Sequence, residues 1–581
     1  MGLIDGVIIV CYFVIVIGAG FYLQKRASKN LEAYFLGGRG IHWLALSISG
    51  SSSMFDITGT MWIVSMFFIM GIRSMWIHWM WGIMMVAFFM AYMGKWVRRS
   101  NVVTGAEWMV TRFGDDSGGR MARLSYAVMA VITLASFIGY AYQGIGKFAA
   151  VYLPFEPSTC AILIIGTTTL YVMLGGLYGV VFTHIIQTVI LVIASIIISV
   201  VAYVRLSPDL ISRSIPSDWT SLLPVWRLDH LAGTENAQYE LFGALVIVWV
   251  MKGLLLNAGG PAQMYDFQTF LAARDPRDAS KIGAAWCAPQ VIRWGMTMGI
   301  TLIALTGIAE VKDPEQIMPI VLKDFLPSGF RGFVLAGFLA AFMSSFSATV
   351  NAGASYIVRD IWQQYFRPGA TQKSLVLAGY VSTLGIVVFG ILLGTRAHSI
   401  AHIWNWLMMA LGAGVLIPNF LRWYWWRMNG WGYAAGTVIG IVLSVVVLFI
   451  PDLPMYVFFP PIVLSSLAGC IIASLVTRPV NEGVLVNFFR TVRPFGFWKP
   501  VLRKSGLTAE DLAKPTDRAS LTLVNVLLGM IALTGYYMFP VYLVGHWHLY
   551  GFLCLTIALA ASGVLVFTWY RYLPAPEPHS N

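Results

Sequence analysis

Ionisable side chains inside long apolar stretches are the first candidates for chemistry in this sequence. Asp56, His78 and Arg293 each lie within a run of apolar residues long enough to cross a bilayer. A charge in hydrocarbon is costly and persists only where a partner, an ion or a solute compensates it, so we expect these residues at a functional site. Two of them have structural alternatives. Asp56 suits the start of a helix, where it accepts backbone N–H bonds, and His78 suits an interfacial belt among the tryptophans around it.

Catalytic and metal-binding patterns are missing from the sequence. It has no His, Asp and Glu cluster at metal-ligand spacing and no nucleophile with a neighbouring base. The five cysteines all lie in apolar blocks without CxxC spacing, so neither a disulfide framework nor a zinc site is expected. We therefore expect a protein that is not an enzyme and has no organic cofactor.

The composition indicates an integral membrane protein. The 581 residues are 58% hydrophobic and 11% charged, with a mean hydropathy of +0.74, which is more apolar than a soluble core requires. A membrane helix needs about 20 residues. The first block, Leu3 to Leu23, is expected to be a retained span because it lacks a basic leader and a cleavage site. Fifteen spans are predicted, at about 3–23, 43–68, 75–94, 124–151, 158–173, 178–204, 241–272, 284–309, 332–358, 375–394, 400–421, 433–450, 457–476, 520–540 and 547–570.

The basic residues orient these spans. If the N-terminus is outside, most of the 38 Lys and Arg residues fall in cytoplasmic segments, as the positive-inside rule requires. We therefore expect a multi-pass protein of the cell membrane with its N-terminus outside and its C-terminus cytoplasmic. The net charge of +12 then reflects orientation in the lipid and does not indicate a nucleic-acid partner. Lys147 and Lys252 lie within spans and are expected to extend their ammonium groups to the outer face.

The spans fall into groups. The outside loop 206–240 separates five spans in 43–205 from five more in 241–425, with segment 1–42 before them and accessory helices in 426–581, which contain a basic cytoplasmic loop at 477–519. Each group contains a polar or Gly- and Pro-rich interruption, at 50–59 and 257–261. Paired breaks are typical of inverted-repeat transporters, in which backbone freed from the helix lines a cavity or binds an ion. The alternative is that these residues only permit kinks and close packing.

Three stretches carry a family resemblance: Leu31 to Arg39, Gly175 to Gln187, and Ala340 to Ser345. In this order and spacing they resemble the sodium:solute symporter family, which includes sodium–glucose, proline and sialic acid cotransporters. The resemblance implies an all-α fold of the leucine-transporter type. This fold has ten core helices in a 5+5 inverted repeat, here with one extra N-terminal and about four extra C-terminal helices, and works by alternating access.

The resemblance also implies a sodium site. Carried over to this sequence, its ligands are the backbone carbonyls of Met54, Ile57 and Ala341 and the hydroxyls of Ser344 and Ser345. Sodium is a hard cation that binds such neutral oxygens well. The alternative is that the small residues of 336–352, spaced four apart, serve close helix packing.

A solute site follows from the resemblance in the same way. Gln263 falls at a position that contacts substrate in relatives, and His78 and Arg293 fall near substrate-binding residues of some relatives. With Asp56 and Thr58 of the first break, they form the expected solute site. The compensating partner of Arg293 is an anionic solute, Asp56 or Asp266.

Two departures from the family pattern bear on coupling. His184 replaces an aspartate, and Ala348 occupies the place of a serine that serves a second sodium in some members. We therefore expect one sodium per solute, with His184 structural or admitting protons. The expected function is sodium-coupled symport of a small polar organic solute, either a sugar or polyol or an organic acid. Alternatives are a proton-coupled transporter of the same fold, or a channel or sensor that retains it. The solute and the choice between monomer and homo-oligomer stay open.

Overall fold

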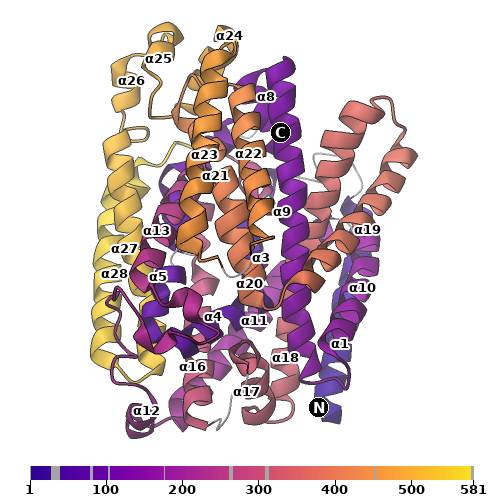
Figure 1. The fold of residues 1–581 in the computed structure, drawn as a ribbon, viewed down its shortest axis with the longest axis vertical. Helices are drawn as coiled ribbons and strands as arrows, with labels where there is room; N and C mark the ends of the chain where they lie inside the picture. The colour runs from indigo at the N-terminus through magenta and orange to yellow at the C-terminus, as the bar shows by residue number, and fades with distance from the viewer. Residues whose placement is uncertain are drawn as a thin grey trace.

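The computed structural model describes residues 2–27, 39–78, 83–102, 105–175, 177–260, 266–307, 313–450 and 453–576, which form an almost entirely helical bundle (Figure 1). Within these residues, ten helical segments are long and apolar enough to cross a membrane. Three shorter apolar helices, at Leu3–Ile15, Pro157–Leu170 and Phe242–Ala258, accompany them. The prediction of an all-α membrane protein with many spans is confirmed.

The helices are given in chain order, in the sets into which the sequence divides them. The N-terminal helix and the first group are α1 (Leu3–Ala27), α3 (Trp43–Met54), α4 (Ile57–Met70), α5 (Met75–His78), α6 (Ile83–Phe88), α7 (Gly94–Arg99), α8 (Gly105–Phe113), α9 (Ser117–Ala150), α10 (Pro157–Gly175) and α11 (Leu177–Arg205). The outer loop and the second group contain α12 (Pro208–Ser214), α13 (Phe242–Ala258), α14 (Asp266–Leu271), α15 (Pro276–Ala285), α16 (Ala288–Gly307), α17 (Ile317–Phe325), α18 (Phe330–Ser355), α19 (Gln372–Arg396), α20 (Ile400–Asn405) and α21 (Gly412–Tyr424). The accessory helices are α22 (Gly430–Val447), α23 (Met455–Val476), α24 (Glu482–Val492), α25 (Lys499–Ser505), α26 (Ala509–Ala513), α27 (Ala519–Val544) and α28 (His548–Thr568).

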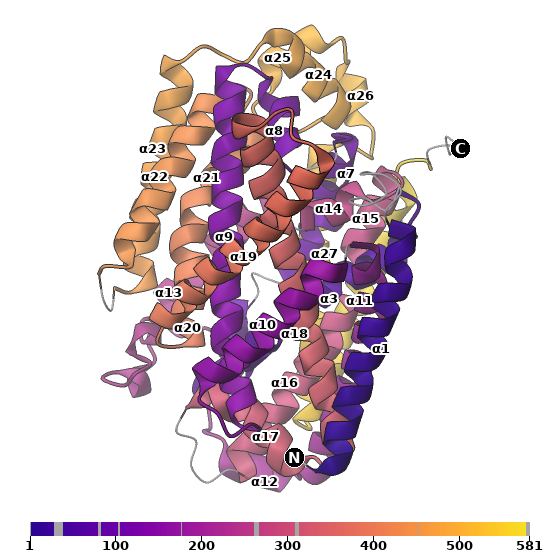
Figure 2. The same ribbon diagram turned by 90° about the vertical axis from the view of Figure 1, so that its right-hand side faces the viewer.

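The two ends of the bundle differ in what they carry. Helices α24, α25 and α26 of the basic segment lie at one end, and the start of α1, α12 and α17 lie at the other (Figures 1 and 2). The N-terminal helix and the accessory helices surround the core: α1 packs on α11 and α18, α22 packs on α9 and α21, and α27 packs on α6 and α16. The end with the basic helices is the predicted cytoplasmic end.

The first break separates α3 from α4. Helix α3 ends at Met54 and α4 begins at Ile57, so two residues leave helical geometry in the middle of a buried segment. Asp56 caps α4, because its carboxylate accepts a bond of 2.9 Å from the backbone N–H of Gly59. The helix-capping role considered for Asp56 is therefore present.

The second break follows α13. This helix ends at Ala258, Gly260 has a φ of +112°, which favours glycine, and α14 begins at Asp266. The carbonyls at the end of α13 are bonded by aromatic side chains of α21: Tyr424 Oη donates to Ala258 O at 2.9 Å, and Trp423 Nε1 donates to Gly259 O at 2.9 Å. Both of these backbone oxygens thus have side-chain partners.

Ion pairs tie α9 to its neighbours at both of its ends. Arg123 pairs with Asp360 at 2.7 Å near the predicted cytoplasmic end. At the other end, Lys147 pairs with Asp313 at 2.8 Å and with Glu315 at 2.6 Å. Glu315 also accepts bonds from the first backbone N–H groups of α20, at 2.8 and 2.9 Å. Lys147 therefore reaches acidic partners at the end opposite the predicted cytoplasmic end.

Candidate solute and ion site at the first helix break

A cavity of about 100 Å³ lies beside the first break, between α4, α9, α16 and α18. This is several times the ~10–15 Å³ that one water molecule needs. Four of the five residues predicted to bind solute line it: Asp56, Thr58, His78 and Arg293. The fifth, Gln263, lies outside the described residues, as does most of the 31–39 stretch. The side chain of Asp266, one of the partners considered for Arg293, is not described either.

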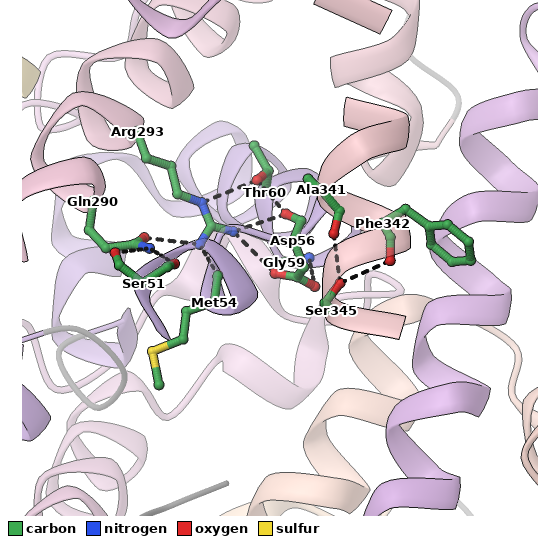
Figure 3. Close-up of polar contacts among 10 residues, drawn as sticks. All are labelled: Ser51, Met54, Asp56, Gly59, Thr60, Gln290, Arg293, Ala341, Phe342 and Ser345. Atoms are coloured by element: carbon green, nitrogen blue, oxygen red, sulfur yellow. Dashed lines mark hydrogen bonds and ion pairs between the residues drawn. The ribbon is translucent and has the colours of Figure 1, made fainter. Parts of the chain in front are cut away.

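Arg293 of α16 binds the broken helix itself (Figure 3). Its Nη1 donates to Met54 O at 2.8 Å, its Nε to Thr60 Oγ1 at 3.1 Å, and its Nη2 to Asp56 O at 3.3 Å. The guanidinium also lies 3.4 Å from the Asp56 carboxylate and 5.0 Å from the Phe55 ring centroid. Of the partners considered for Arg293, Asp56 is therefore the one that the structure supplies, together with backbone oxygens that the break releases.

Gly59 is the residue that permits this close approach. A Cβ added there would lie 2.5 Å from Asp56 Oδ1, 3.0 Å from Tyr140 Oη and 3.1 Å from Arg293 Nη2. Any side chain would separate the cap from the guanidinium. Thr58 is fixed in a similar way, because a Cβ on Gly144 of α9 would lie only 2.1 Å from its Oγ1.

His78 lies within an aromatic cluster. It is 3% exposed, and its ring centroid lies 4.8 Å from that of Trp62, 5.4 Å from Trp294 and 5.9 Å from Phe67. Within the described part of the chain, neither ring nitrogen has a hydrogen-bond partner. The interfacial position considered for His78 does not fit this burial, and the ring instead faces the cavity.

The residues predicted to bind sodium divide into two sets. Met54, Ile57 and Ser345 line the cavity, whereas Ala341 and Ser344 are buried in α18 and do not. Ser345 Oγ donates to Ala341 O at 2.9 Å and to Phe342 O at 3.3 Å within its own helix, which leaves its lone pairs able to accept a cation (Figure 3).

Two of the predicted ligand oxygens, Ser344 Oγ and Met54 O, show whether the predicted site could accept a cation. Ser344 Oγ is buried and has no partner among the described residues, so a buried acceptor is available on α18. Met54 O already accepts from Arg293, and a carbonyl retains a second lone pair. The set of neutral oxygens fits sodium chemically.

His184 has a structural contact. It is 4% exposed, and its Nδ1 lies 3.0 Å from Ser49 Oγ, so it joins α11 to the segment of α3 just before the break. A polar bond of this kind fixes α3 against α11 at the place where an aspartate was expected.

Sequence reasoning missed several cavity residues. Gln290, one turn before Arg293, donates to Ser51 O at 3.0 Å and accepts from Arg293 at 3.3 Å. Its spacing of three residues from Arg293 was a usable signal, because such residues share a helix face. Tyr537 of accessory helix α27 also lines the cavity, and nothing in the sequence pattern connects it to the core.

Known proteins resemble this chain over most of its length. It is 25% identical over 513 residues to the osmoregulated proline transporter OpuE of Bacillus subtilis, covering 85% of this chain and 97% of that protein. It is 23% identical over 584 residues to sodium/glucose cotransporter 4 of Danio rerio, covering 83% and 80%. These relatives are transporters.

The fold has a solved counterpart. A Na⁺-coupled sialic acid symporter in a substrate-bound, outward-open state superposes with a TM-score of 0.64 at 17% identity, over 83% of this chain and 99% of that one. Residues 34–440 match the sequence profile of the sodium:solute symporter family. The family expected from the three sequence stretches is thereby confirmed: this chain belongs to the sodium:solute symporter family.

Proposed function

We propose that this protein is a sodium-coupled symporter for a small, neutral or zwitterionic polar solute, which binds in the cavity beside the first break. The observation that carries the choice of solute is the pairing of Arg293 with Asp56. Because the two charges face each other at 3.4 Å, the site already contains the counter-ion of its guanidinium. An anionic solute would have to displace Asp56 or leave an unpaired carboxylate, which is costly in a buried site. A sugar, a polyol or an amino acid is therefore favoured over an organic acid.

The aromatic wall supports the same class of solute. Trp404 of α20 lies 4.9 Å from Tyr140 and 5.4 Å from Trp62 between ring centroids, and all three line the cavity. Flat apolar faces next to a few polar groups are typical of small-molecule sites. By name, relatives of this chain transport proline and glucose, which are small polar ring compounds of this kind.

Sodium is proposed to bind between α18 and the first break, at Ser344, Ser345 and the carbonyls of Ala341, Met54 and Ile57. A cation held there joins the break to α18, so its binding favours one arrangement of these two elements. Solute bound beside the same break favours that arrangement as well, and this shared preference would couple the two ligands.

Proton coupling is the second candidate. The specific observation in its favour is His78, a buried imidazole that faces the cavity and has no hydrogen-bond partner among the described residues. The imidazole is a group lining this cavity that a transported proton could occupy.

A ligand screen followed by transport separates these candidates. Purified protein is melted with sugars, polyols, amino acids and organic acids, with and without sodium, because a bound ligand raises the melting temperature. Hits are then tested for uptake into proteoliposomes under a sodium gradient or a proton gradient. We expect a neutral or zwitterionic hit whose uptake requires the sodium gradient. Uptake driven by protons alone would replace sodium coupling, and preference for a dicarboxylate would refute the solute class.

A further inference from the structure

Lys252 of α13 is fully buried and does not line the first cavity. It is 0% exposed, and its Nζ lies 4.9 Å from the Trp249 ring centroid. Within the described residues, Nζ has no hydrogen bond and no acidic partner. The expectation that Lys252 reaches the outer face is therefore wrong, because packing against Trp249 and Gly412 encloses its side chain: a Cβ on Gly412 would lie 3.8 Å from Nζ.

A second cavity, of about 40 Å³, adjoins this lysine. It lies between α9, α13 and α21, at the second break, where Gly259 and Gly260 form part of its wall. Phe137 lines both cavities and stands between them. The volume exceeds what one water molecule needs, at ~10–15 Å³.

The polar groups of this cavity are suited to a negative ligand. Thr133 Oγ1 is buried and, like Lys252 Nζ, has no partner among the described residues. Asn419 Oδ1 accepts from Tyr433 Oη at 3.0 Å, so the amide NH₂ is the end that can still donate. No described Asp or Glu lines the cavity. A lysine amine, a hydroxyl and an amide NH₂ therefore line a space without a described carboxylate.

We propose that this second cavity is an anion site, in which Lys252 Nζ and Thr133 Oγ1 bind a small monovalent anion. Two sources share this chemistry: an inorganic halide, and the carboxylate group of a small organic acid or amino acid. A bound anion supplies the counter-charge that the protonated form of this buried amine requires. The site is separate from the proposed solute cavity, so it can fail without affecting the sodium and solute assignments, and the reverse also holds.

Anion-dependent melting of the purified protein tests the site. Sodium concentration and ionic strength are held constant while chloride, bromide, formate or acetate replaces isethionate, a bulkier sulfonate. We expect the melting temperature to rise saturably with at least one of the small anions. A rise with halides alone identifies the inorganic source, a rise with formate and acetate alone identifies the carboxylate source, and a rise with both identifies the shared chemistry.

Two variants assign the effect to this cavity. Lys252→Met keeps an unbranched side chain, one atom shorter, and removes the amine, so the anion-dependent shift should disappear. Thr133→Val keeps the shape and removes one donor, so the half-saturating concentration should rise about fivefold, as the loss of one hydrogen bond implies. Lys281→Met, at a lysine whose partner is Asp278 at 3.3 Å, is the matched control and should respond as the wild type does.

The outcomes are decisive even if Lys252→Met does not fold, because Thr133→Val then decides alone. Equal melting temperatures of the wild type in all the salts would overturn the proposal. So would a shift that survives unchanged in Thr133→Val or in a folded Lys252→Met protein, since a general salt effect on stability would not depend on these side chains.

Discussion

Replacing Arg293 with glutamine removes the side chain that holds the first break together. The arginine side chain is 7% exposed and contacts Met54 O at 2.8 Å, Thr60 Oγ1 at 3.1 Å and the Asp56 carboxylate at 3.4 Å. Glutamine is shorter and uncharged, so it cannot make these bonds together. The variant therefore leaves a backbone carbonyl without its donor and a carboxylate without its counter-ion.

The size of the effect follows from these contacts. Removing one partner of a buried ion pair costs about 3–5 kcal/mol. Asp56 is 22% exposed on its side chain and keeps its bond from Gly59 N at 2.9 Å, so part of its charge stays solvated and bonded. We therefore expect a loss near the lower limit, about 3 kcal/mol of unfolding free energy, or roughly a hundredfold in the folding equilibrium.

Unfolding by denaturing detergent in mixed micelles, with thermal melting in parallel, measures this loss. Asp56→Asn and the double variant Arg293→Gln/Asp56→Asn complete a cycle, and the double variant should lose less than the sum of the single changes because the unpaired charge is gone. Arg227→Gln is the matched control. Its arginine is 56% exposed and pairs with Glu240 in the loop 206–240, so the change should cost less than about 1 kcal/mol.

One result would refute this reasoning. If Arg293→Gln is as stable as the wild type but no longer binds solute, then Arg293 serves the solute directly and the break is held by other contacts. An anionic solute would then return as the favoured substrate class.

Three further predictions concern the ion and the predicted cytoplasmic end. Ser344→Ala and Ser345→Ala should each raise the sodium concentration for half-maximal stabilisation about tenfold, because each removes one charge-assisted contact to the ion. An unchanged concentration in both variants would indicate that the two serines serve helix packing. Reversal potentials in proteoliposomes should give one sodium per solute, and a ratio of two would require a second site built from other residues. Burial raises the pKa of Asp517, but Arg99, at 2.7 Å, together with Lys95 and Arg493 outweighs this effect, and the pKa lies below its usual value. A carboxyl group whose pKa is lower in the folded than in the unfolded state stabilises the fold at pH values above its unfolded pKa, which is about 3.9 for aspartate. This contribution to stability should therefore be lost as the pH falls below about 4. In Asp517→Asn, the melting temperature should depend less on pH in that range. An unchanged pH dependence would show that this carboxylate is not the source of the lost stability.

The breaks show how much a local pattern can predict. Gly, Ser and Pro in the middle of an apolar span are poor helix formers, and both interruptions are present, after Met54 and after Ala258. The role of Asp56 as a helix cap could also be predicted, because an aspartate directly before a helical segment is a local sequence signal. These features depend on residues within one or two helical turns of each other.

Contacts between residues on different helices of the bundle could not be predicted from the sequence in the same way. Arg293 had several candidate partners, and the choice of Asp56 depends on how α16 crosses the first break. Tyr537 enters the cavity because α27 packs against α16. Residues so far apart in the chain meet only through packing, which hydropathy does not encode.

The sequence by itself determined the class, the family and the positions of the two breaks, because membrane burial imposes apolar length and the loss of helix requires particular residues. The tertiary structure decided which buried charges are compensated. Lys147 and Lys252 look alike in the sequence, as single lysines in apolar helices. Lys147 meets Asp313 and Glu315, whereas Lys252 is enclosed beside a cavity without a described acid. The free energy of a buried charge depends on groups within a few ångströms in space, and distant parts of the chain supply those groups.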